Sequence, residues 1–247
     1  MNVRRLSILV AVLILLTLGS HQTLAYMTSH PPFPFGKPAP YPTLHAKPVI
    51  DYKYPAEFTE GNLRIETAKV AEDKVTTRVS VDAKVSLDTA KESPDMPAPM
   101  GSRVFYTDLT GDSRKDIIVY AYPGSNGLGA SIELADLLIA KADGTYHHVS
   151  FEAYAARPED FIDTNGDGRY EMLWVNFYET GRHSYWVYRV VEIGENGLQL
   201  NDQLIPDFPK IIWFTEKPND KPTRRLTAAE REDLIRQSTA KWQGADQ

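Results

Sequence analysis

The fold is decided by two short acidic stretches, Asp108-Leu-Thr-Gly-Asp112-Ser-Arg-Lys-Asp116 and Asp163-Thr-Asn-Gly-Asp167-Gly-Arg-Tyr-Glu171. In both, side chains that carry oxygen stand at positions 1, 3, 5 and 9, and arginine stands at position 7. Each stretch runs directly into β-branched and aromatic residues, Ile117–Tyr122 in the first case and Met172–Phe177 in the second, and this composition favours strands. We therefore predict two loops of one design, each leading into a strand.

The strand and turn signals around the two loops repeat in the same order. After its loop and first strand, the earlier unit continues with Leu137–Ala140, a turn at Asp143-Gly144 and Tyr146–Val149, and the later unit continues with Tyr185–Val191, a turn at Asn196-Gly197 and Leu198–Leu200. Asp108 and Asp163 are 55 residues apart, and Gly144 and Gly197 are 53 residues apart. Asp-Gly and Asn-Gly are also the dipeptides that tight hairpins prefer. We predict a duplicated four-strand unit, at 101–155 and 156–205.

The regions beside the duplication add a strand region and a helix. Val75–Leu87 alternates apolar and polar residues, which predicts a long half-buried strand or a bent pair of strands within 61–100. Residues 206–247 contain a possible strand at Ile211–Phe214 and then a capping box that begins at Thr227 and opens a helix. The predicted fold class is mainly β: two tandem antiparallel units like propeller blades, an N-terminal strand region and a C-terminal helix.

The N-terminus has the pattern of a secretory leader. Arg4 and Arg5 precede the apolar run Leu6–Leu18, and small residues around Ala25 suit cleavage there. A membrane span needs about 20 apolar residues, so an uncleaved anchor is the less favoured alternative. We predict a signal peptide at 1–25, a proline-rich linker or arm at 26–60, and a secreted or periplasmic location.

Composition excludes several classes of function. The chain carries a net charge of −6, which becomes −8 without the two leader arginines, so neither nucleic acid nor, after leader cleavage, an anionic membrane is an expected partner. It contains no cysteine, which excludes disulfides, thiol nucleophiles and zinc–thiolate sites. Nucleophile-elbow, His-Glu-x-x-His, P-loop and dinucleotide-binding motifs are also missing, and we expect no enzyme.

Alternating oxygen ligands around a tight bend suit Ca²⁺, which binds six to eight oxygens. The predicted ligands are Asp108, Thr110, Asp112, Arg114 and Asp116 in the first loop, and Asp163, Asn165, Asp167, Arg169 and Glu171 in the second. Each arginine would contribute its backbone carbonyl, and the Arg169 side chain would face solvent. At position 6, Gly168 permits a sharp turn, whereas Ser113 would cost about 1 kcal/mol in a left-handed conformation, so the first site should be weaker. The alternative is a pair of Asx turns that hold no metal.

The loops resemble the start of an EF-hand, but position 12 is Val119 or Trp174 in a strand-like run instead of a glutamate before a helix. Their context is similar to the FG-GAP/VCBS-type repeats of integrin-like β-propellers, in which such a loop follows one strand and enters the next. The resemblance covers about residues 101–201 and implies calcium-binding, blade-like sheets. A closed propeller needs at least four blades, and because only two copies carry the motif we expect no ring.

Other candidate residues are weaker. His147 and His148 are adjacent on a predicted strand and point to opposite faces. His183 lies near Glu179, a pair on which a polysaccharide or cell-wall hydrolase would depend. Six aromatic residues are predicted to pack in the core, with a surface for stacking on sugar or protein as the alternative: Trp174, Phe177, Tyr178, Tyr185, Trp186 and Tyr188. The leading hypothesis is an exported calcium-binding module for an unknown protein or carbohydrate partner, and a secreted enzyme inhibitor is a further alternative.

Overall fold

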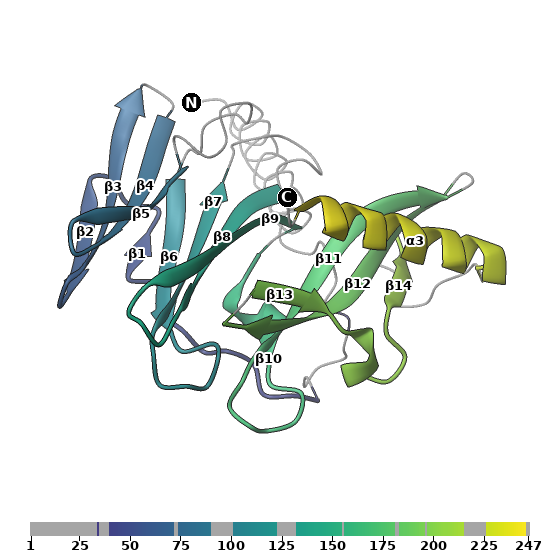
Figure 1. Ribbon diagram of the computed structural model, residues 1–247. Coiled ribbons are helices and arrows are strands. Elements are labelled where there is room, and N and C mark those ends of the chain that lie inside the picture. The colour runs from purple at the N-terminus through teal and green to yellow at the C-terminus, as the bar shows by residue number, and fades with distance from the viewer. Residues whose placement is uncertain are drawn as a thin grey trace, which may run out of the picture. The chain divides into compact units, whose positions relative to one another are not determined.

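The computed structural model describes residues 34, 40–71, 74–89, 101–122, 132–154, 156–180, 183–195, 197–214 and 226–245. The predicted leader at 1–25 lies outside the described residues. Within them the fold class is confirmed as mainly β, with antiparallel sheets and the C-terminal helix α3 (Ala228–Ala245), and the described strands close no barrel or propeller (Figure 1).

The first predicted unit forms a four-stranded meander. Its strands are β6 (Gly101–Thr107), β7 (Asp116–Tyr122), β8 (Ile132–Ala140) and β9 (Tyr146–Tyr154). The first acidic loop joins β6 to β7, and Thr107 pairs with Asp116 where the loop closes. A short strand, β1 (Ile50–Asp51), extends this sheet along the free edge of β6.

The second unit repeats the order of the first. Its strands are β10 (Phe161–Ile162), β11 (Glu171–Thr180), β12 (His183–Gly194) and β13 (Gly197–Leu200). The second acidic loop joins β10 to β11, the same place that the first loop has in its own sheet. Strand β14 (Lys210–Trp213), which the sequence predicted, pairs with the first part of β12.

A third sheet precedes these units and contains β2 (Ala56–Glu60), β3 (Leu63–Ala71), β4 (Lys74–Val81) and β5 (Lys84–Asp88). The alternating segment Val75–Leu87 is a hairpin, β4–β5, and so corresponds to the bent pair. Its turn places Asp82 and Ala83 at φ of 49° and 61°, a conformation that alanine rarely adopts and that no residue type there signals. Because β1 begins at Ile50 and β2 at Ala56, both strands start inside the range 26–60 that we predicted as a linker.

Two of the apolar cores among the described residues pack the sheets against one another. Ile118 and Leu137 of the first unit belong to one core with Phe161 and Trp174 of the second. On alternate positions of the same strands, Ile117, Val119 and Leu138 form a second core with Ile65 and Val79 of the third sheet. Strands β7 and β8 are therefore buried on both faces, which explains why their sequences are apolar almost throughout.

Helix α3 lies against β11 and β12 (Figure 1). Leu234 and Trp242 of this helix are buried there. Trp242 stacks edge-on against Trp174 with ring centroids 4.9 Å apart. Among the described residues, no helix has the length and apolar character of a membrane span.

The last part of the predicted arm is bonded to both units. The Val49 N–H donates to the Val104 carbonyl (2.8 Å), which adds this segment to the first unit. Further towards the N-terminus, Leu44 N–H donates to the Phe161 carbonyl (2.9 Å) and Asp163 N–H donates to the Pro42 carbonyl (2.9 Å). The second acidic loop therefore begins at a residue that the arm itself positions.

Candidate metal centre

The two acidic loops lie directly against each other. The Tyr170 N–H donates to the Leu109 carbonyl at 2.9 Å. A methyl group at Gly111 would come within 2.9 Å of the Gly168 carbonyl oxygen, so the backbones are too close for any side chain at this position. The fold therefore brings the two sets of predicted ligands, 55 residues apart in sequence, into one region.

Both loops are closed by the same hydrogen bonds. The position-1 carboxylate accepts the backbone N–H groups of positions 4 and 6. Asp108 accepts those of Gly111 (2.7 Å) and Ser113 (2.8 Å), and Asp163 accepts those of Gly166 (2.6 Å) and Gly168 (3.0 Å). The position-5 carboxylate accepts the N–H of position 7: Arg114 to Asp112 (2.7 Å) and Arg169 to Asp167 (2.8 Å). The position-9 carboxylate accepts the N–H of position 2: Leu109 to Asp116 (2.7 Å) and Thr164 to Glu171 (3.1 Å). This agreement supports one loop design used twice.

The backbone bends in the same way in both loops. Positions 4 and 6 have positive φ throughout: Gly111 at 67° and Ser113 at 70° in the first loop, Gly166 at 79° and Gly168 at 82° in the second. Ser113 is thus held in the left-handed conformation on which our expectation of a weaker first loop depended. The strain at this residue is about 1 kcal/mol relative to glycine.

The position-9 carboxylates fasten the loops to the sheets. Asp116 is fully buried, and besides Leu109 it accepts the N–H groups of Thr110 (3.3 Å) and Ala140 (2.8 Å). Burial raises the pKa of Asp116 to about 6, although these hydrogen bonds partly oppose the shift. Both oxygens of this side chain are engaged by the backbone, so Asp116 supports the loop more than it offers a free ligand.

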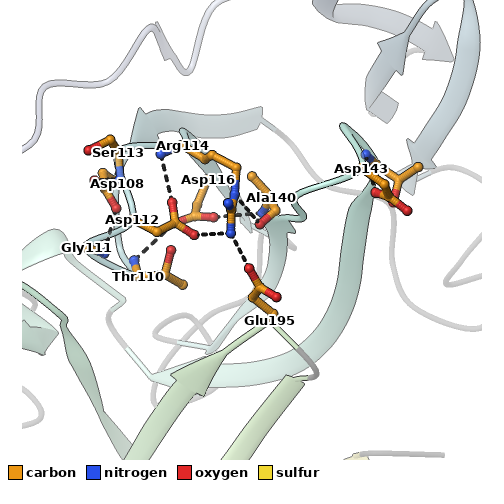
Figure 2. Close-up of polar contacts among 11 residues, drawn as sticks. Asp108, Thr110, Gly111, Asp112, Ser113, Arg114, Asp116, Ala140, Asp143 and Glu195 are labelled. Carbon is orange, nitrogen blue, oxygen red and sulfur yellow. Dashed lines mark hydrogen bonds and ion pairs between the residues drawn. The ribbon is translucent and has the colours of Figure 1, made fainter.

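The first loop contains buried oxygen atoms that lack hydrogen bonds. Thr110, at position 3, is 6% exposed, and its hydroxyl oxygen has no hydrogen-bond partner. The Oδ2 atom of Asp112, at position 5, is buried without a hydrogen bond, although it forms an ion pair with Arg114. Figure 2 shows the Asp112 carboxylate directed at the Arg114 guanidinium, with the Thr110 side chain beside it. A polar atom left in this state costs free energy, and oxygens at positions 3 and 5 are suitable partners for a hard cation.

The second loop satisfies its oxygens differently. Asn165 donates its side-chain amide to Asp167 (3.0 Å) and accepts the Asp167 N–H (3.0 Å). Hydrogen bonds from the Arg169 backbone and from Asn165 hold the pKa of the exposed Asp167 below its ordinary value. This loop therefore keeps an accessible carboxylate that stays charged at neutral pH.

As they stand, the loops are closed by backbone amides in the manner of Asx turns. In the described part of the chain, no group of three or more His, Asp or Glu side chains is arranged to hold a metal ion. Coordination would require side chains at positions 1, 3 and 5 to turn some oxygens inward. Calcium binding therefore stays a prediction.

The two position-7 arginines differ. The Arg114 guanidinium contacts both Asp112 and Glu195, and its Nε donates to the Ala140 carbonyl at 3.3 Å (Figure 2). Glu195 belongs to the turn between β12 and β13, so this arginine links the first loop to the second unit. Arg169, in contrast, forms no ion pair among the described residues. The sequence offered no indication of the Arg114 contacts, because Glu195 lies 81 positions away.

Sequence reasoning also missed a cluster of serine, histidine and aspartate. His148 Nε2 lies 2.9 Å from Asp136 Oδ1 and 3.2 Å from Ser150 Oγ, and Ser150 donates directly to Asp136. A catalytic triad needs one ring nitrogen for each partner, whereas here a single nitrogen faces both, so this arrangement cannot relay a proton in that way. The two-residue spacing of His148 and Ser150 on one strand was the available signal.

The remaining candidates have structural roles. Tyr185, Trp186 and Tyr188 are almost fully buried, in agreement with the packing interpretation of the aromatic region. His183 packs edge-on against Trp213 at 5.7 Å, and Glu179 accepts a hydrogen bond from Ser184 at 3.4 Å. Comparison with known proteins found no matching family model, no matching curated protein and no matching solved structure.

Proposed function

We propose that the protein binds Ca²⁺ at its two adjoining acidic loops and that the ion stabilises the fold without taking part in catalysis. The observation that carries this proposal is the repetition of one hydrogen-bonded framework, with oxygen side chains at the same positions, in both loops. The buried hydroxyl of Thr110, which has no hydrogen-bond partner, adds support for the first loop.

The chemistry of the loops suits a hard cation. Side-chain oxygens at positions 1, 3 and 5 and the position-7 carbonyls would hold the ion: Asp108, Thr110, Asp112 and Arg114, with Asp163, Asn165, Asp167 and Arg169. Asp116 and Glu171 would brace the loops from outside through the N–H groups that they already accept. A ligand that binds only the folded state adds about 2.7 kcal/mol of stability at a hundred times its Kd.

The proposal includes export and a role in surface interaction. The leader pattern at 1–25 supports a secreted or periplasmic location, where calcium modules work with dissociation constants of about 10⁻⁴–10⁻³ M. The resemblance to FG-GAP/VCBS-type repeats supports a binding module whose partner is a protein or a carbohydrate. Among the described residues, no observation favours the hydrolase alternative: His183 packs against Trp213, and Glu179 accepts a hydrogen bond from Ser184.

Calorimetric titration of the purified protein with CaCl₂ tests the proposal, together with thermal unfolding in EDTA and in millimolar Ca²⁺. We expect heat of binding and a higher unfolding midpoint with Ca²⁺, both lost in the Asp112→Asn/Asp167→Asn double variant. Asp143→Asn is the matched control, since Asp143 accepts the Thr145 N–H (2.9 Å) in a comparable turn outside the loops. Equal midpoints in EDTA and Ca²⁺, with no heat of binding, would reject the proposal.

A further inference from the structure

We propose that Arg114 is a built-in counter-ion that competes with Ca²⁺ for Asp112 and thereby lowers the calcium affinity of the first loop. This inference rests on the proposed function. It concerns how the site is regulated: the second loop fills at lower Ca²⁺ concentration, and the first loop fills only where Ca²⁺ is abundant enough to displace the arginine from Asp112.

The contacts of Arg114 carry the inference. Its guanidinium pairs with the Asp112 Oδ2 atom, one of the oxygens that the first loop would offer to an ion. The same guanidinium is held from the other side by Glu195, and its Nε is held by the Ala140 carbonyl. Because these anchors lie outside the predicted ligand set, the arginine stays beside the loop without any contribution from calcium.

Charge makes the competition direct. A calcium ion about 2.3–2.6 Å from an Asp112 oxygen would draw on the same carboxylate charge that the Arg114 guanidinium already pairs with. The two cations also repel each other at such a separation. Ca²⁺ therefore has to weaken the ion pair between Asp112 and Arg114, whereas the contacts of Arg114 with Glu195 and Ala140 can remain.

The second loop provides the internal comparison. Arg169 occupies the same position 7 and forms no ion pair in the described part of the chain, although its charge is one of the smaller causes that lower the pKa of Asp167. The corresponding oxygen, Asp167 Oδ2, accepts a hydrogen bond from the neutral amide of Asn165. An ion that approaches the second loop therefore displaces a neutral donor, and an ion that approaches the first loop displaces a cation.

Calorimetric CaCl₂ titration of paired variants tests this inference. In an Asp167→Ala background, which disables the second loop, we expect Arg114→Gln to tighten calcium binding about tenfold, the factor that corresponds to about 1.4 kcal/mol. In an Asp112→Ala background, Arg169→Gln should tighten binding at the second loop by less than about threefold. This control removes the same charge at the same loop position without removing a direct competitor.

A second variant changes affinity in the opposite direction. Glu195→Gln removes the outer anchor of Arg114, so the guanidinium pairs more strongly with Asp112, and calcium binding at the first loop should weaken.

Ser113→Gly separates the backbone effect, because it should tighten binding whether or not Arg114 is present. Circular dichroism in EDTA establishes that each variant is folded before titration.

The outcomes distinguish this inference from the proposed function. If the first loop binds Ca²⁺ and Arg114→Gln changes its affinity no more than Arg169→Gln changes that of the second loop, the inference is overturned and the proposed function stands. Tighter binding in Glu195→Gln would also overturn it. If neither the unmodified protein nor the Arg114→Gln variant binds Ca²⁺, both fail.

Discussion

Tyr170 and Leu109 join the two acidic loops through a 2.9 Å hydrogen bond from the Tyr170 N–H to the Leu109 carbonyl oxygen. Tyr170 stands at position 8 of the second loop and Leu109 at position 2 of the first. The bond is backbone to backbone, so it does not depend on either side chain. This hydrogen bond and the close approach of Gly111 to the Gly168 carbonyl hold the backbones of the two loops against each other.

Gly111→Ala should disturb this contact. The new methyl group would meet the Gly168 carbonyl at 2.9 Å, and φ at this position is 67°, so we expect a loss of about 2–3 kcal/mol in the free energy of unfolding. Gly144→Ala is the control, because Gly144 also has positive φ but nothing lies within 4 Å of an added methyl group. It should cost about 1 kcal/mol. Equal losses in urea unfolding would show that the close contact between the loops is unimportant.

Ser113→Gly should stabilise the protein by up to about 1 kcal/mol, because φ of 70° strains serine and leaves glycine unstrained. The Ser113 N–H bond to Asp108 does not involve the side chain and should remain. Urea unfolding in EDTA measures the gain without a contribution from metal. Ser113→Ala keeps the strain, so an equal gain in that variant would contradict the explanation.

Burial of Asp160 predicts that stability falls as the pH rises. Burial raises the pKa of Asp160 to about 7, against the opposing effect of Arg157, so the folded state holds a proton that the unfolded chain releases near its ordinary pKa of about 3.8. Below pH of about 4 both states are protonated. Between about 4 and 7 the folded state binds more protons, and stability therefore decreases over this range.

Asp160→Asn tests this assignment because asparagine does not titrate. The free energy of unfolding, measured in EDTA from pH 4 to 8, should decline less steeply in the variant than in the parent. Asp116 contributes a decline of the same sign up to about pH 6, so a shallower slope should remain. Parallel curves for the two proteins would rule out Asp160 as the source.

Trp242→Ala should cost about 3–5 kcal/mol, since Trp242 is 4% exposed and packs against both Trp174 and Phe151. Lys241→Ala is the neighbouring control, because Lys241 makes only a partly exposed ion pair with Glu152, worth about 0–1 kcal/mol. Urea unfolding monitored by tryptophan fluorescence gives both values. A small loss in Trp242→Ala would mean that α3 contributes little to the core.

Local sequence signals predicted the elements that depend on neighbouring residues. The strand order around each acidic loop, β14 and the start of α3 all follow from alternation, turn residues and the capping box at Thr227, whose hydroxyl accepts the Glu230 N–H at 3.2 Å. These features are set within a few residues, so one chain suffices to indicate them.

Features that depend on distant partners were not predictable. For Val75–Leu87 the sequence left one long strand or a bent pair open, because the turn at Asp82 and Ala83 contains no glycine or asparagine. The Arg114–Glu195 contact exists only because the first loop reaches the β12–β13 turn of the second unit, which single-sequence patterns do not encode. The same holds for Asp136, whose contacts with His148 and Ser150 depend on the register of β8 and β9.

The segment from Pro42 to Tyr52 has a mechanical consequence. Its hydrogen bonds hold the second unit at Phe161 and Asp163 and the first unit at Ser102 and Val104. Separation of the two units would break the hydrogen bonds between residues 42–52 and one of the units. The units should therefore separate and lose these contacts in a single step. Proteolytic cleavage within residues 42–52 would remove this connection between the units and leave the backbone of each unit uncut.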